Sequence, residues 1–102
     1  MRKEVKDYHV MFYGSETGYN DYRAQIMLSG LAGNTIAFIR FIDEGMEFKQ
    51  DYEDDQIVRM HLPSNMFHNV LDVLRNEKPV YIMYRVGRGF LSTSKEPVGE
   101  GE

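Results

Sequence analysis

The hydrophobic and polar positions between residues 56 and 86 predict a strand, a helix and a second strand. Apolar residues alternate over 56–62, take helical spacing over 64–75 and alternate again over 79–86. Ser64 is a candidate N-cap for the helix, and Pro79 prevents the helix from continuing. We expect the apolar stripe of this helix to cover one face of a sheet; the stripe consists of Met66, Phe67, Val70, Leu71 and Leu74.

Period-two alternation predicts further strands over residues 8–13, 23–31 and 35–42, and a short last strand over 90–93. Short polar turns join most of these strands, including a hairpin turn at Gly33-Asn34, so we expect antiparallel pairing. The predicted fold is α+β and mainly β: a curved antiparallel sheet or small open barrel of about six strands, with the helix between strands 4 and 5. Residues 1–94 form the predicted single domain, and 95–102 a flexible acidic tail.

The negative charge is concentrated in one segment. The chain has a formal net charge of −4, but residues 43–55 alone hold seven acids against one lysine. We expect this acidic segment to be a solvated loop, because it lacks the ligand spacing of a calcium-binding loop. The rest of the domain is then mildly basic, which leaves room for a local basic surface.

Composition sets limits on the class of protein. The chain has 102 residues, is 42% hydrophobic and contains no cysteine, so disulfides and thiol chemistry are excluded. Its first residues are charged and are not followed by an apolar run, which is unlike a signal peptide or a membrane helix. We therefore expect a cytoplasmic protein with no membrane association.

Few residues are arranged for chemistry. The three histidines have no metal-ligand spacing, and no serine lies in a nucleophile motif. Gly87-Arg88-Gly89 is typical of a hairpin turn, since it lacks the third glycine and the following helix of a phosphate-binding loop. We expect a protein that is not an enzyme and that has neither a metal nor a cofactor.

The predicted sheet face opposite the helix, here called the second face, is the candidate functional surface. It carries one arginine on each of four strands, with apolar and aromatic residues between them. Apolar patches that contain arginine and aromatic residues are typical of subunit interfaces, so self-association into a homo-oligomer is the first interpretation. Arginines and rings on a sheet also bind single-stranded RNA or DNA, which is the alternative. The candidate residues are Arg23, Arg40, Arg59, Arg85, Phe38, Tyr81 and His61.

Two features resemble nucleic-acid-binding folds. The segment Tyr84-Arg85-Val86-Gly87-Arg88-Gly89 resembles the Arg-Gly turn of Sm-like RNA-binding barrels, and this likeness adds Arg88 to the candidate residues. The four-strand meander followed by a helix resembles the single-strand-binding coactivator fold. Both resemblances imply binding of single strands on the sheet, although Sm-like proteins place their helix before the strands.

Overall fold

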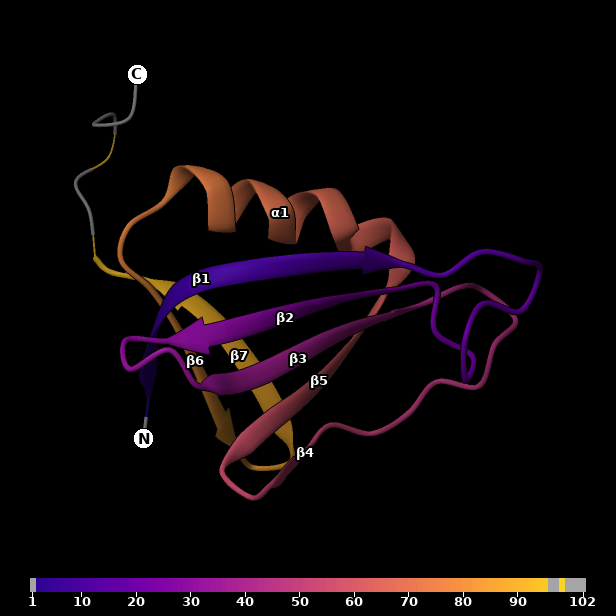
Figure 1. Ribbon diagram of the computed structural model, residues 1–102, viewed down its shortest axis with the longest axis horizontal. Helices are drawn as coiled ribbons and strands as arrows, with labels where there is room; N and C mark the ends of the chain where they lie inside the picture. Colours follow the sequence, from indigo (N-terminus) through magenta and orange to yellow (C-terminus); the bar gives the residue numbers. More distant parts are fainter. Residues whose placement is uncertain (1, 96–97, 99–102) are drawn as a thin grey trace.

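One strongly curled sheet forms the body of the protein. The computed structural model describes residues 2–95 and 98, which form seven strands in the order β4-β5-β3-β2-β1-β6-β7 (Figure 1). The sheet curls into a half-barrel with one short helix across it, so the predicted mainly β fold is confirmed. The strands are β1 (Lys3–Phe12), β2 (Ala24–Gly30), β3 (Thr35–Ile42), β4 (Tyr52–Asp54), β5 (Ile57–Pro63), β6 (Val80–Arg85) and β7 (Arg88–Thr93).

The core lies on the face that the alternation predicts. Alternate residues of β2 and β3 are fully buried, and Phe67 and Val70 of the helix pack against them. Phe67 lies with its ring centroid 5.1 Å from that of Phe41 and 4.9 Å from that of Phe12. Met66, by contrast, is 38% exposed, so its place in the apolar stripe is wrong.

The pairing of β3 with β5 is parallel, which the sequence did not predict. The chain leaves β3, forms β4 at the edge of the sheet and returns as β5 between β4 and β3. Asp55 and Gln56 both take positive φ, at 54° and 64°, which gives the two-residue turn between β4 and β5. The sheet is therefore mixed, with one parallel pair among antiparallel ones.

The first strand begins earlier than predicted because its two halves have different neighbours. Residues from Val5 onward pair with β2, whereas Lys3, Glu4 and Val5 pair with β6. A register shift between Val5 and Asp7 joins the two halves. β1 is thus the strand that connects the β1–β2–β3 meander to the last hairpin.

The helical segment has two parts: the 3₁₀ turn η1 (Ser64–Met66) and the α-helix α1 (Phe67–Asn76). The prediction that Ser64 caps the helix is wrong, because neither part has a side-chain cap and the Ser64 hydroxyl donates to Asp43 instead. The prediction for the tail falls mostly on residues outside the described part of the chain.

Candidate functional site

Strand pairing on the second face brings Phe38, Arg40 and Arg59 together. Phe38 and Arg40 alternate on β3, and the parallel register places Arg59 of β5 beside Phe38. The guanidinium carbon of Arg40 lies 5.0 Å from the Phe38 ring centroid, and that of Arg59 lies 5.7 Å from it. One phenyl ring thus contacts two cations, each at cation–π distance.

Residues outside β3 and β5 extend this arrangement in both directions. The ring of Tyr22, near the end of the β1–β2 loop, lies 5.1 Å from the Arg40 guanidinium and 4.7 Å from the Lys49 ammonium. At the other end, the Arg59 guanidinium lies 5.4 Å from the Tyr52 ring. The result is a row of alternating cations and rings along the second face, here called the ladder: Lys49, Tyr22, Arg40, Phe38, Arg59 and Tyr52.

The three ladder cations are not neutralised by carboxylates. Arg40 donates from Nε to the Gln25 side chain at 2.9 Å, and Arg59 donates from Nη1 to backbone carbonyl oxygens. In residues 2–95 the structure has two carboxylate pairs, Arg23–Asp43 and His61–Asp51, and neither includes a ladder residue. The ladder therefore keeps its positive charge available for an anionic partner.

His61 lies next to the ladder and is held by Asp51. Its ring stacks on Tyr22 and Tyr52, with centroid distances of 5.9 and 6.5 Å. The Asp51 carboxylate accepts from the His61 backbone N–H at 2.7 Å and contacts His61 Nδ1 at 3.2 Å, while its other oxygen accepts from the Gly89 N–H at 2.8 Å. We call these contacts the Asp51 clasp. It joins β5, the second strand from one end of the curled sheet, to β7 at the other end.

The protonation state of His61 follows from its burial. Its side chain is fully buried, and burial lowers the pKa of His61 despite the opposing effect of Asp51. The imidazole is therefore neutral at pH 7, and the carboxylate acceptor assigns the proton to Nδ1. Among residues 2–95 and 98, no group forms a hydrogen bond with Nε2, so none of their hydroxyls completes a catalytic triad here.

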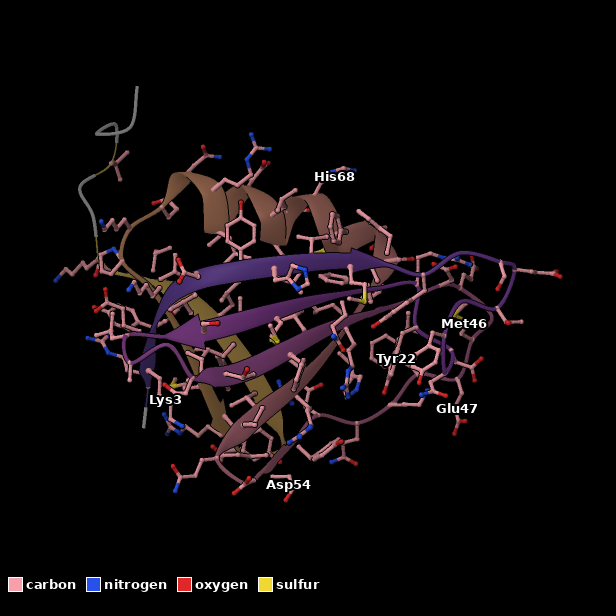
Figure 2. The ribbon with its side chains drawn as sticks, in the orientation of Figure 1. Lys3, Tyr22, Met46, Glu47, Asp54 and His68 are labelled. Atoms are coloured by element: carbon pink, nitrogen blue, oxygen red, sulfur yellow. The ribbon has the colours of Figure 1, made fainter. Side chains whose placement is uncertain are left out.

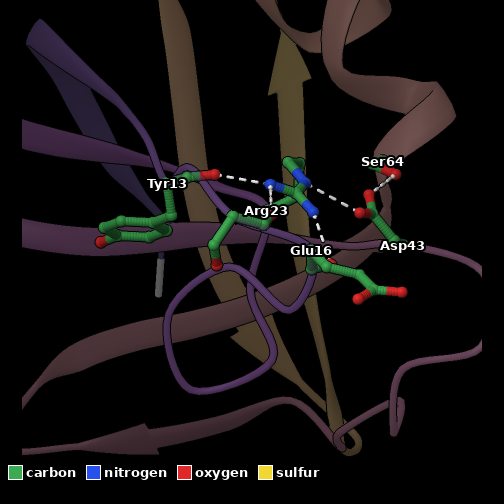
Figure 3. A network of polar contacts seen from close by, with 6 residues as sticks. Tyr13, Glu16, Arg23, Asp43 and Ser64 are labelled. Carbon is green, nitrogen blue, oxygen red and sulfur yellow. Dashed lines mark hydrogen bonds and ion pairs between the residues drawn. The ribbon is translucent and has the colours of Figure 1, made fainter.

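Arg23 has a structural role at the end of the sheet (Figure 3). Its Nε donates to Asp43 at 2.8 Å, and its Nη groups donate to the carbonyl oxygens of Tyr13, Ser15 and Glu16. Asp43 also accepts from the Ser64 hydroxyl at 2.7 Å, and the Ser64 and Arg23 hydrogen bonds lower the pKa of Asp43. We call these contacts the Asp43 clasp. They fix the β1–β2 loop and the start of η1 to the ends of β2 and β3.

The structure does not place the other predicted residues in the ladder. Tyr81 is on β6, and the Arg2 guanidinium lies 4.0 Å from its ring. Arg85 and Arg88 are exposed and face each other in register across the β6–β7 hairpin. In the strand order, β2 and β1 separate β6 from β3. Of the eight predicted residues, the structure thus gathers Arg40, Arg59, Phe38 and His61.

Three ladder residues were missed by the sequence reading. Tyr22, Lys49 and Tyr52 lie in the two segments predicted as polar loops, where no alternation indicates which way a side chain points. The sequence did contain a weaker indication than strand alternation. These loops are rich in Gly, Asn and acids, and the aromatic residues in them stand out. Both aromatic residues at these positions, Tyr22 and Tyr52, stack on His61.

Comparison with protein families, curated proteins and solved structures finds no match to this chain. Within the residues that the structure describes, no three acidic or histidine side chains gather to hold a metal ion. No helix in that same part of the chain is long and apolar enough to cross a membrane. The geometry of the ladder is therefore the basis on which a function can be inferred.

Proposed function

We propose that this protein is a non-catalytic binding protein that holds single-stranded nucleic acid on the ladder. The observation that supports this is the alternation of three cations with three aromatic rings along one sheet face. Bases of a single strand stack on rings and on guanidinium planes, while phosphates pair with Lys and Arg. Alternating rings and cations suit a strand whose bases and phosphates also alternate.

Burial of the apolar residues on the second face also favours this function over self-association. Six apolar residues occupy the positions that the alternation assigns to this face: Met27, Ile36, Phe38, Ile42, Tyr81 and Met83. Ile36 and Ile42 are each only 2% exposed in the single chain, and the other four are half-buried. Ile36 joins the core cluster, at a register shift between β2 and β3. Two of the six apolar residues are therefore buried within the single chain and are not available to a second copy.

Self-association through the same face is the second candidate. β4 and the turn after it expose Glu53, Asp54 and Asp55, whose charge complements the ladder of another copy. Such a contact joins different surfaces of the two copies, so it generates a ring or a chain of copies.

One double variant tests both candidates. Changing Arg40 and Arg59 to Glu together should abolish binding of a fluorescein-labelled 20-residue oligo(dT), measured by fluorescence anisotropy. Arg75→Glu with Lys78→Glu is the matched control, because it changes the charge equally at exposed positions outside the ladder. Wild-type affinity should fall with salt with a log–log slope of about −2, from about −0.7 per phosphate neutralised by three cations.

Light scattering on the same samples separates the outcomes. A monomeric wild-type protein that binds the oligonucleotide, and loses binding only in the ladder variant, supports the proposal. An oligomer that dissociates in the ladder variant, with no wild-type binding of the strand, supports self-association. Equal affinity in the ladder and control variants would show that the ladder does not bind the strand. Arg40→Gln with Arg59→Gln replaces the Glu variant if circular dichroism shows that it is unfolded.

A further inference from the structure

A hollow of about 430 Å³ lies at the Lys49 end of the ladder. It lies between the β1–β2 loop and the loop that follows β3, and Figure 2 shows Tyr22 and Glu47 at this end of the sheet. Arg40 and Lys49 line it together with the rings of Tyr13, Tyr19 and Tyr22. Its size is within the usual range for small-molecule sites.

The walls of this hollow are held in place by contacts within the loop. Tyr19 and Tyr22 exchange two backbone hydrogen bonds, at 3.1 and 2.9 Å. The Lys49 ammonium donates to the Asn20 carbonyl oxygen at 3.3 Å, which ties one loop to the other. The Asp43 clasp fixes the start of the β1–β2 loop. The hollow is therefore formed before a ligand arrives, which lowers the entropy cost of binding.

The chemistry of the walls suits one aromatic base with one phosphate. Tyr13 and Tyr19 have ring centroids 5.4 Å apart, and Tyr19 is 60% exposed, so it presents a ring surface to a ligand. Lys49 and Arg40 bring two positive charges to the same hollow, and Arg40 uses its Nε rather than its Nη groups to contact Gln25. The carboxylates of Asp21 and Glu47 are acceptors for sugar hydroxyls or a base amino group.

We propose that this hollow is a nucleotide pocket that takes a nucleoside 5′-monophosphate unit. The unit is either a free nucleotide or the 5′-phosphorylated end of a strand that continues along the ladder. This inference rests on the proposed function, because Arg40 and Lys49 belong to both the ladder and the hollow. In the strand-end case, the pocket fixes where a bound strand begins.

The first experiment compares ligands on the wild-type protein. Isothermal titration calorimetry with adenosine 5′-monophosphate, adenosine and inorganic phosphate should show the monophosphate binding at least about tenfold more tightly than either fragment. Competition with 5′-phosphorylated and 5′-hydroxyl oligo(dA) of ten residues distinguishes the two sources. A tenfold preference for the phosphorylated strand, abolished by the free monophosphate, assigns the pocket to strand ends. Equal competition by both strands assigns it to the free nucleotide.

Two single variants separate the pocket from the ladder. Tyr19→Ala should reduce monophosphate affinity about tenfold or more, the effect of losing one stacked base, and leave 5′-hydroxyl strands unaffected. Arg59→Gln should weaken strand binding and leave the monophosphate unaffected, because Arg59 does not line the hollow. Phe48→Ala is the control for Tyr19→Ala, since Phe48 is an exposed aromatic residue outside both the hollow and the ladder.

The outcomes distinguish failure of the pocket from failure of the proposed function. If strands bind but the monophosphate does not, and a 5′ phosphate changes nothing, the nucleotide pocket is wrong and the ladder function remains. If the monophosphate binds and strands bind no more tightly than it does, the pocket remains and strand binding is wrong. If neither ligand binds, both proposals are wrong. Equal losses in Tyr19→Ala and Phe48→Ala would also overturn the pocket.

Discussion

Asp43 and Asp51 lie near the two ends of the same acidic loop, and each joins parts of the chain that are distant in sequence. Asp43 is partly exposed and contacts a charged arginine and a hydroxyl. Asp51 is 13% exposed at its side chain and contacts a neutral imidazole and two backbone N–H groups. The effect of a carboxylate on stability thus depends on which groups its removal leaves without a hydrogen-bond partner. Removing Asp51 leaves the backbone N–H groups of His61 and Gly89 without their acceptor, whereas removing Asp43 leaves Arg23 with three carbonyl acceptors.

The largest expected effect is therefore that of Asp51→Ala. Loss of the carboxylate leaves the N–H groups of His61 and Gly89 without an acceptor, which should cost about 2–4 kcal/mol of unfolding free energy. Urea denaturation followed by circular dichroism measures it. Asp54→Ala is the control, because Asp54 is an exposed acid of the same segment, residues 43–55. Equal urea midpoints for both variants would show that the Asp51 clasp does not hold the half-barrel closed.

Asp43→Ala should have a smaller effect, about 1–2 kcal/mol. Arg23 keeps its three carbonyl acceptors in this variant, and Ser64 turns to water. The same denaturation experiment applies, with the exposed neighbour Glu44→Ala as control. A loss larger than that of Asp51→Ala would reverse the ranking of the two clasps.

The pH dependence of stability should come from His61 between pH 7.5 and 5.5. Burial lowers the pKa of His61 in the folded state, so the unfolded chain binds more protons in this range. Stability should therefore fall as the pH decreases below about 6.5, by at most about 1.4 kcal/mol per pH unit for one group. The slope should disappear in His61→Gln and persist in His68→Gln, whose histidine is exposed on α1. An unchanged slope in His61→Gln would assign it to another group.

Salt should have the smallest effect on the unfolding free energy. It should affect the Asp43 clasp, which contains an ion pair, and not the Asp51 clasp, whose imidazole is neutral. The Arg23–Asp43 pair is charged and partly exposed, so raising salt from 0.05 to 1 M should weaken it by about 0.5 kcal/mol. Arg23→Gln removes the ion pair and with it this salt dependence of the unfolding free energy. His61→Gln at pH 7.5 should keep the salt dependence, because it leaves the ion pair intact. We expect the difference in urea midpoint between low and high salt to shrink only in Arg23→Gln. Equal shrinkage in both variants would mean that His61 is charged.

The alternation of apolar and polar residues predicted the strands and the core, because a strand with one buried face has an apolar residue at every second position. Ala24, Ile26, Leu28 and Phe41 are buried as expected. Alternation carries no record of strand direction, which is why the parallel β3–β5 pair was missed. The short β4 was also missed, because all three of its residues are exposed and no pattern results.

The candidate site was predictable only where it lies on strands. Phe38 and Arg40 were found because their neighbours on β3 are buried, which fixes the direction of their side chains. Asp51 was predicted to be a solvated acid because it stands in an acidic run, and that prediction is wrong. Its partner Gly89 is 38 positions away, and no local pattern links them. Long-range contacts of single loop residues are visible only in three dimensions.

The distance in sequence between Asp51 and Gly89 also indicates the order in which parts of the sheet form during folding. The β1–β2–β3 meander joins neighbours in sequence, so it can form early, while the ends of the half-barrel can meet only after the last hairpin exists. A chain growing from its N-terminus therefore carries an unclosed sheet until residue 89 has emerged. Closure of the half-barrel by the Asp51 clasp is then a late event in folding. The N–H groups of His61 and Gly89 gain their shared acceptor only at that stage.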